Sequence, residues 1–127
     1  MTPVQAGRFF RAYVASRLVS LGVSGASART DQARRPVRLS EAFAEAAERP
    51  ASDVLGVPGW SLVTSHRMPL DVAKALDAAR VAAALDGNQK FAAICSRPGA
   101  NPEASYVVTT MEVLADLVRE SDHDLAR

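Results

Sequence analysis

Hydrophobic residues recur at helical spacing in three long parts of the chain. In residues 3–21, apolar side chains return every three or four positions, which predicts an amphipathic helix that stops at Gly22. The segment 69–85, PLDVAKALDAARVAAAL, has the same spacing and predicts a second helix, with Gly87 just after its end. Residues 111–119 predict a third helix that closes the chain, with Thr110 as its N-cap.

The chain between the first helix and the first strand is less regular. Residues 23–38, VSGASARTDQARRPVR, are small, polar and basic, which predicts a loop. A shorter helix is expected at about 39–50, because Ser40 is a suitable N-cap and Pro50 stops helical continuation. At the other end, residues 121–127 are expected to be a frayed tail.

Four short apolar runs predict strands, and turn-forming Pro58 and Gly59 separate the first two. The runs cover residues 53–57, 60–65, 90–97 and 105–110. The resulting order of helices and strands predicts a single α/β domain over 1–127, with a small mixed β-sheet flanked by helices. Trp60 follows the Pro-Gly corner and is expected to be buried between the sheet and a helix.

The composition fits a domain that needs no disulfide or metal to fold. Of 127 residues, 48% are hydrophobic but only 6% aromatic, so the core must consist mainly of Ala, Val and Leu. The single cysteine, Cys95, lies in a predicted strand and is expected to be an inert core thiol in a reducing compartment. No apolar run approaches the roughly 18 residues that span a bilayer, and arginines interrupt any signal-peptide pattern. We therefore expect a cytoplasmic protein with no membrane partner.

The charge is unevenly placed although the net charge is only +1. Residues 1–40 contain seven arginines and one acid, a net charge of +6, whereas residues 41–127 have a net charge of −5. Such asymmetry can mark an end that binds polyanions, and the forked donors of arginine suit phosphate. The nucleic-acid-binding candidates are Arg29, Arg34, Arg35 and Arg38. The alternative is that these arginines only solvate a surface helix and loop.

Most motifs that carry chemistry are absent from the sequence. It contains no glycine-rich phosphate loop, no Cys/His metal spacing and no serine nucleophile elbow. Asp53 is the main candidate, because it stands at the start of a predicted strand beside a turn. An acid in that place either ligates a metal or caps backbone N–H groups, and the sequence leaves both readings open.

An ordered set of segments is more informative than any one residue. The set comprises AGRFFRAYVASRLVSLG, DVLGVPGW, PLDVAKALDAARVAAA and FAAICSRPGANPEASYVVTTMEVLADLV. Together they resemble the PD-(D/E)xK nuclease superfamily, in particular the small Holliday-junction-resolvase-like proteins of actinobacteria and their phages. The resemblance covers about residues 6–120, with 39–50 as an inserted helix or a lengthened connection. It implies a restriction-endonuclease-like fold.

The resemblance also implies where a catalytic site would lie. Asp53 matches the first metal-binding acid of the family, Val63 falls where a strand Glu would stand, and Ser65 falls where the Lys would stand. Arg11 lies close to where such resolvases often carry another acid. Because Mg²⁺ normally recruits several oxygen ligands and valine cannot ligate, no metal or cofactor is expected, and Asp53 is at most a relic metal ligand.

A site that has migrated within the fold is the remaining route to catalysis. Lys74 and Asp77 share a helix face, and His66 follows a predicted strand. Three acids, Glu41, Glu45 and Glu48, form a stripe on the expected helix 39–50 and could meet Asp53. The simpler interpretation of all these residues is a solvated surface with local ion pairs.

Three hypotheses for function follow. The first is a catalytically inactive nuclease-fold protein, a pseudoenzyme of phage or bacterial origin, that binds nucleic acid through residues 1–40. The second is a structural or assembly component of a phage particle, located in the virion, that contacts phage structural proteins or forms a homo-oligomer. The third is an active Mg²⁺-dependent DNA endonuclease or resolvase with a migrated site.

Overall fold

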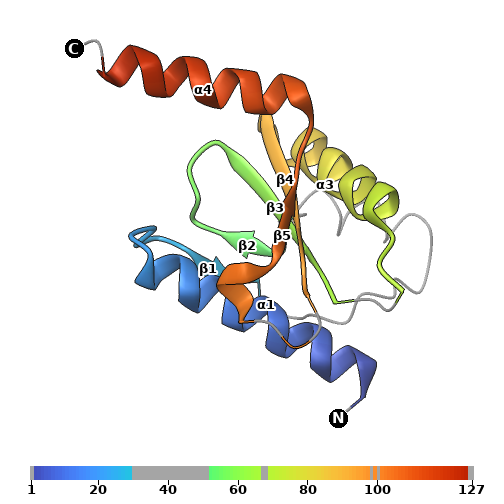
Figure 1. Cartoon of the computed structure of the whole chain (residues 1–127). Coiled ribbons are helices and arrows are strands. Elements are labelled where there is room, and N and C mark those ends of the chain that lie inside the picture. The colour runs from blue at the N-terminus through green and yellow to red at the C-terminus, as the bar shows by residue number, and fades with distance from the viewer. Residues whose placement is uncertain (1, 30–51, 67–68, 98, 100, 126–127) are drawn as a thin grey trace.

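The protein folds as an α/β domain, as the sequence predicts (Figure 1). The computed structural model describes residues 2–29, 52–66, 69–97, 99 and 101–125. The helices are α1 (Pro3–Ser20), α3 (Val72–Asp86) and α4 (Met111–Leu125), with a 3₁₀ turn η1 at Pro102–Ala104. The strands are β1 (Ser27–Ala28), β2 (Val54–Leu55), β3 (Trp60–Ser65), β4 (Lys90–Cys95) and β5 (Tyr106–Val108).

The five described strands form one mixed sheet in the order β1-β2-β3-β4-β5. Strands β1, β2 and β3 pair antiparallel, and β5 pairs antiparallel with β4. The central pair, β3 and β4, is parallel and in register from Trp60↔Lys90 to Ser65↔Cys95. A parallel pair needs a long crossover, and α3 supplies it.

Two helices cover the two faces of the sheet. On one face, Phe10 and Val14 of α1 pack against Val54, Leu62 and Ala92. On the other face, small side chains of α3 meet small side chains of β4 in a cluster of Ala75, Ala79, Ala93 and Cys95. Because successive side chains of a strand point to opposite faces, neighbouring residues of β3 and β4 serve different clusters. The core therefore consists of two thin apolar layers, one on each side of the sheet.

The observed elements differ from the predicted ones mainly at their ends. Strand β3 has the predicted bounds, whereas β1 lies inside the predicted loop 23–38. Two residues carry no strand signal, and Ser27 and Ala28 become a strand only because β2 pairs with them. The prediction of a frayed tail is wrong up to Leu125, since α4 continues that far. The expected helix at 39–50 lies outside the described residues.

Trp60 is less buried than the sequence predicts. Its ring is partly buried at the margin of the α1-side cluster and is not enclosed between the sheet and a helix. The reason is its position: Trp60 is the first residue of β3, at the end of the sheet next to the Val57–Gly59 corner.

Helix α4 is joined to the domain by few side chains. Thr110 caps it as predicted, accepting a hydrogen bond from Val113 N at 3.2 Å. Val113 is buried, and Lys90 of β4 binds Glu120 at 2.5 Å. Figure 1 shows α4 crossing one end of the sheet, well separated from α1. Much of its apolar face remains exposed as a result.

A close approach of two glycines fixes the corner that leads into β3. A Cβ added to Gly56 would lie 1.8 Å from the carbonyl oxygen of Gly25. Gly56 also has a positive φ of 77°, which side chains other than glycine's rarely adopt. Only glycine at position 56 therefore allows the chain after β2 to lie against Gly25, which precedes β1.

We predict that Gly56→Ala is much more destabilising than Gly59→Ala. Gly59 has a similar φ of 80° but open space where a Cβ would go, so it isolates the cost of backbone strain. That strain costs about 1–2 kcal/mol, and the clash at Gly56 should add at least about 1–3 kcal/mol. Chemical unfolding of both variants measures the difference. Equal losses of stability would contradict the proposed close contact.

Candidate functional site

The carboxylate of Asp53 is the focus of a buried polar cluster. Arg29 Nη2 donates to Asp53 Oδ1 at 2.9 Å, and Arg11 Nη1 lies 3.5 Å from the same oxygen. The backbone N–H of Thr64 donates to Asp53 Oδ2 at 2.9 Å, and its hydroxyl lies at 3.4 Å. Both carboxylate oxygens are thus engaged by groups from α1, β3 and the segment after β1.

The backbone of Asp53 joins the same three parts of the chain. Its N–H donates to the carbonyl oxygen of Leu62, and its carbonyl oxygen accepts from Arg29 N, both at 2.8 Å. Asp53 therefore links β1, β2 and β3 through its main chain, while its side chain holds α1 through Arg11. The capping role that the sequence left open is observed here, since Asp53 binds a backbone N–H of the neighbouring strand.

The electrostatics of this cluster differ from those of a metal site. Only 7% of the Arg11 side chain and 13% of the Asp53 side chain are exposed, so this ion pair is shielded from water. A buried charge is costly unless it is paired and hydrogen-bonded, and two guanidinium groups offset this carboxylate. The neighbours of the Asp53 carboxylate are therefore two positively charged arginines. A metal-binding acid would instead have a second acid as its neighbour.

The two other positions of the expected catalytic site do not join Asp53. Val63 packs on the α3 side of the sheet with the Ala75–Cys95 cluster, whereas Asp53 contacts Arg11 on the α1 side. Ser65, two residues after Val63, lines the same side. The β3 residue whose side chain adjoins Asp53 is Thr64. A glutamate placed at position 63 and a lysine placed at position 65 would thus lie on the α3 side of the sheet, away from the Asp53 carboxylate.

Val63 and Ser65 instead line a small hollow of about 170 Å³ against α3. Its other lining residues are Thr64, Asp71, Lys74, Ala75 and Ala78. Asp71 is the N-cap of α3 and accepts from Lys74 N at 3.0 Å, so its carboxylate has a structural partner. The sequence did not anticipate that Lys74 would share this hollow with Ser65.

The other candidates for a migrated site do not converge. Asp77 is exposed on α3, and His66 Nδ1 lies 2.8 Å from Ser96 Oγ with its ring near Phe10. Glu41, Glu45 and Glu48 lie outside the described residues. Within the described ranges, no three His, Cys, Asp or Glu side chains are grouped as a metal ion would require.

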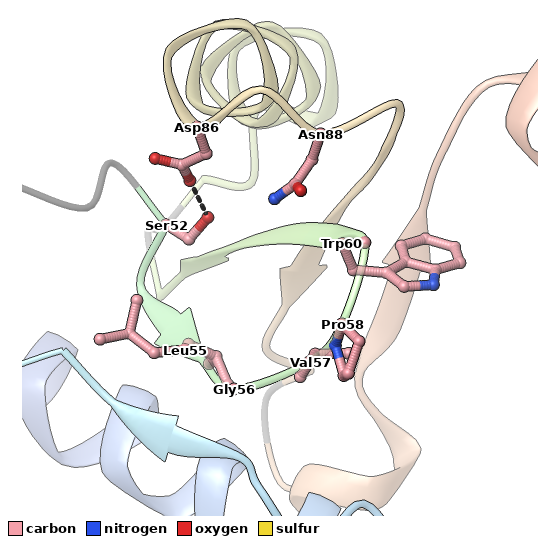
Figure 2. Close-up of a pocket in the computed structure, with 10 residues that line it drawn as sticks. Ser52, Leu55, Gly56, Val57, Pro58, Trp60, Asp86 and Asn88 are labelled. Carbon is pink, nitrogen blue, oxygen red and sulfur yellow. Dashed lines mark hydrogen bonds between the residues drawn. The ribbon is translucent and has the colours of Figure 1, made fainter.

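A second hollow, of about 330 Å³, lies at the opposite end of β3 (Figure 2). The Val57–Trp60 corner forms one wall, and Asp86, the last residue of α3, forms the other with Asn88 just beyond the helix. Asp86 Oδ2 accepts from Ser52 Oγ at 2.5 Å and from Ser61 Oγ at 3.1 Å. Sequence reasoning missed this network, because isolated serines and a helix-end aspartate carry no motif. The network ties α3 to β3 through Ser61 and to Ser52, which precedes β2.

Of the four arginines that the sequence predicts to bind nucleic acid, only Arg29 lies within the described residues. Arg29 is partly buried, and its guanidinium group pairs with Asp53 at 2.9 Å. Arg34, Arg35 and Arg38 lie outside the described residues. Of the other arginines in residues 1–40, Arg11 contacts Asp53 and Arg17 pairs with Glu103 at 3.1 Å.

Cys95 is a core residue, as the sequence predicts. Its side chain is fully buried among Ala75, Ala79 and Ala93. Burial raises the pKa of the Cys95 thiol above its ordinary value of 9.0, because the charged thiolate loses its hydration. A thiol kept protonated and enclosed is a poor nucleophile.

Comparisons of the chain with protein-family models, with curated proteins and with solved structures found no match. Among the helices of the described residues, none has both the length and the apolar character needed to cross a membrane.

We predict that Asp53→Asn destabilises the fold by about 3–5 kcal/mol, the usual cost of breaking a buried ion pair. The amide keeps the shape of the side chain but leaves Arg11 and Arg29 without their counter-charge. Asp77→Asn on the exposed face of α3 is the control and should change stability by less than about 0.5 kcal/mol. Urea unfolding measures both. A neutral or stabilising effect of Asp53→Asn would contradict the anchoring role of this carboxylate.

Proposed function

We propose that this protein is a non-catalytic assembly domain with a restriction-endonuclease-like fold, and that it works by binding other protein chains. Three features support the fold proposal: an opening helix, a three-stranded antiparallel meander, and a crossover helix leading to a parallel strand. They occur in the order that the resemblance to the PD-(D/E)xK nucleases implies.

The cluster around Asp53 supports the absence of catalysis. Phosphodiester hydrolysis with Mg²⁺ needs several oxygen ligands and a polarised water. Here the one acid that matches the family is paired with Arg11 and Arg29. Val63 and Ser65 lie on the other side of the sheet and offer neither a carboxylate nor an amine.

The observation that carries the assembly role is the exposed apolar face of α4. Met111, Leu114 and Val118 recur at helical spacing and are 85%, 51% and 51% exposed. Tyr106 and Val107 of the edge strand β5 are also exposed, and β5 immediately precedes α4. An amphipathic helix whose apolar side faces water is typical of a binding surface.

Charge indicates what kind of partner this face accepts. Helix α4 contains five acids and one arginine. Such a helix is repelled by nucleic acid and by anionic lipid, because both carry dense negative charge. A protein surface with apolar and basic groups is the partner that suits it.

Nucleic-acid binding is the second candidate, and the net charge of +6 on residues 1–40 favours it. Because Arg29 is bound to Asp53, this candidate depends on Arg34, Arg35 and Arg38. Neutralising each phosphate on a duplex contributes about 0.9 to the slope of log affinity against log salt. A slope that flattens by about two units in the Arg34→Ala/Arg35→Ala double variant would establish this role.

We predict no cleavage of branched, duplex or single-stranded DNA in the presence of Mg²⁺ or Mn²⁺. The assay compares the wild type with Asp53→Asn and with Asp77→Asn, which leaves the Asp53 cluster intact. Metal-dependent cleavage that is lost only in Asp53→Asn would contradict the non-catalytic proposal.

We predict that a photoreactive amino acid at position 114 crosslinks to another polypeptide in the cells that naturally make the protein. The same probe at position 77, which is exposed on α3 outside the apolar face, is the control and should give no defined product. Denaturing gels and mass spectrometry identify the products. Crosslinks from position 114 to nucleic acid alone, or none above the level at position 77, would contradict the assembly role.

A further inference from the structure

The second hollow, beside the Val57–Trp60 corner, has one polar wall and one apolar wall. Figure 2 shows the side chains of Ser52, Asp86 and Asn88 extending into the space opposite the corner. The corner side, residues 55–60, contributes apolar side chains and two glycines and carries no charge. The volume of about 330 Å³ lies at the lower end of the range of roughly 300–1,000 Å³ for small-molecule sites. The hollow therefore has room for a small ligand or for one side chain of a partner.

The polar wall is a chain of hydrogen bonds. Asn88 Nδ2 donates to Ser61 Oγ at 3.0 Å, and Ser61 Oγ donates to Asp86 Oδ2 at 3.1 Å. Ser52 Oγ donates to the same carboxylate oxygen at 2.5 Å. Both serines are buried, and each hydroxyl has only one proton to donate. The serine protons are thus used within the wall, and the groups that remain to meet a ligand are mainly acceptors.

These acceptors can bind a ligand in addition to their protein partners. A carboxylate has about four lone-pair positions, so Asp86 can accept from a ligand beside the two serines. Asn88 Oδ1 accepts from no group in the part of the chain that the structure describes. A ligand that carries positive charge and several N–H donors complements both groups.

The end of helix α3 adds to the negative charge of the hollow. Asp86 is the last residue of α3, and the last turn of this helix contains no basic residue. The carboxyl end of a helix carries partial negative charge and favours cations, so an acid in this place is electrostatically unfavourable. Lys90, the next basic residue along the chain, is bound to Glu120. A local conflict of this kind is expected where a site binds a ligand.

We propose that this hollow binds a guanidinium group carried on an aliphatic stem. The charged head would lie between Asp86 and Asn88, because the forked donors of guanidinium suit two separate acceptors. The stem would lie along the apolar wall at Val57 and Pro58. A small organic cation and the arginine side chain of a polypeptide both have this chemistry. The inference does not depend on the assembly function proposed for α4.

Binding of butylguanidinium, measured by two-dimensional amide NMR, tests the proposal. Butylurea has nearly the same shape but no charge and is the matched control. We expect a dissociation constant on the order of 1 mM for butylguanidinium, because a ligand of so few atoms gains little binding energy. Butylurea should bind at least about tenfold more weakly, since it lacks a charged hydrogen bond to Asp86. The signals that shift should include those of Ser52, Gly87 and the side-chain amide of Asn88.

Two variants test the polar wall. Asp86→Asn removes the charge, keeps the shape and should weaken butylguanidinium binding at least about tenfold. Asn88→Ala removes the amide oxygen and should weaken binding about threefold or more. Asp77→Asn changes an exposed acid of α3 outside the hollow and should leave binding unchanged. Thermal melting checks folding. If Asp86→Asn does not fold, Asn88→Ala and the comparison of the two probes on the wild type decide.

A peptide probe distinguishes the two sources of the guanidinium group. The peptide acetyl-Gly-Arg-Gly-amide presents it on a polypeptide, and the same peptide with citrulline in place of arginine is the neutral control. Tighter binding of the arginine peptide than of butylguanidinium would assign the hollow to the side chain of a partner. Equal or weaker binding would assign it to a small organic cation.

Other outcomes would overturn the inference. Absence of butylguanidinium binding, or equal affinity for butylurea, would show that the hollow does not select a cation. Shifts confined to the acids of α4 would indicate nonspecific ion pairing at the surface. Unchanged binding in both Asp86→Asn and Asn88→Ala would place the ligand elsewhere. Crosslinking from position 114 tests the assembly function separately from all of these results.

Discussion

The carboxylate of Asp53 is the point on which the arrangement of the sheet depends. It is buried, and an isolated buried carboxylate would be strongly unfavourable, so the fold has to bring cations and N–H donors to it. Arg11 from α1, Arg29 from beyond β1 and the backbone of Thr64 on β3 meet this requirement. Together with the apolar cluster of Phe10, Val14, Val54 and Leu62, this network holds β1, β2, β3 and α1 in one geometry.

The same interaction argues against a metal-dependent reaction at Asp53. In a magnesium site, the bound metal ion neutralises the charge of several acids. At Asp53, the side chains of Arg11 and Arg29 neutralise the charge instead. The large exposed apolar side chains lie away from this cluster, among them Phe9 on α1 and Leu114 on α4.

The sequence predicted those parts of the structure that local patterns determine. The bounds of β3, the cap at Thr110 and the burial of Cys95 follow from alternation, capping chemistry and apolar flanks. Strand β1 could not be predicted, because two residues become a strand only through pairing with β2. Trp60 was expected to be enclosed, but the end of the sheet leaves it partly open.

The candidate site was predictable in its residues but not in its geometry. Asp53 and Arg11 were both identified from the sequence, yet nothing in their spacing shows that they form an ion pair. Nor does spacing show that Val63 and Ser65 face α3. The Asp86–Ser61 network was missed entirely, because residues distant in sequence form it without a motif.

A double-mutant cycle between Arg11 and Asp53 tests the central claim most directly. The cycle uses Arg11→Gln, Asp53→Asn and the double variant, with free energies of unfolding measured in urea. If the buried pair anchors the fold, its coupling energy should be about 1–3 kcal/mol, within the range for residues in direct contact. A coupling energy near zero, together with an increase in the melting temperature of the wild type on adding Mg²⁺, would show instead that Asp53 is kept as a metal ligand.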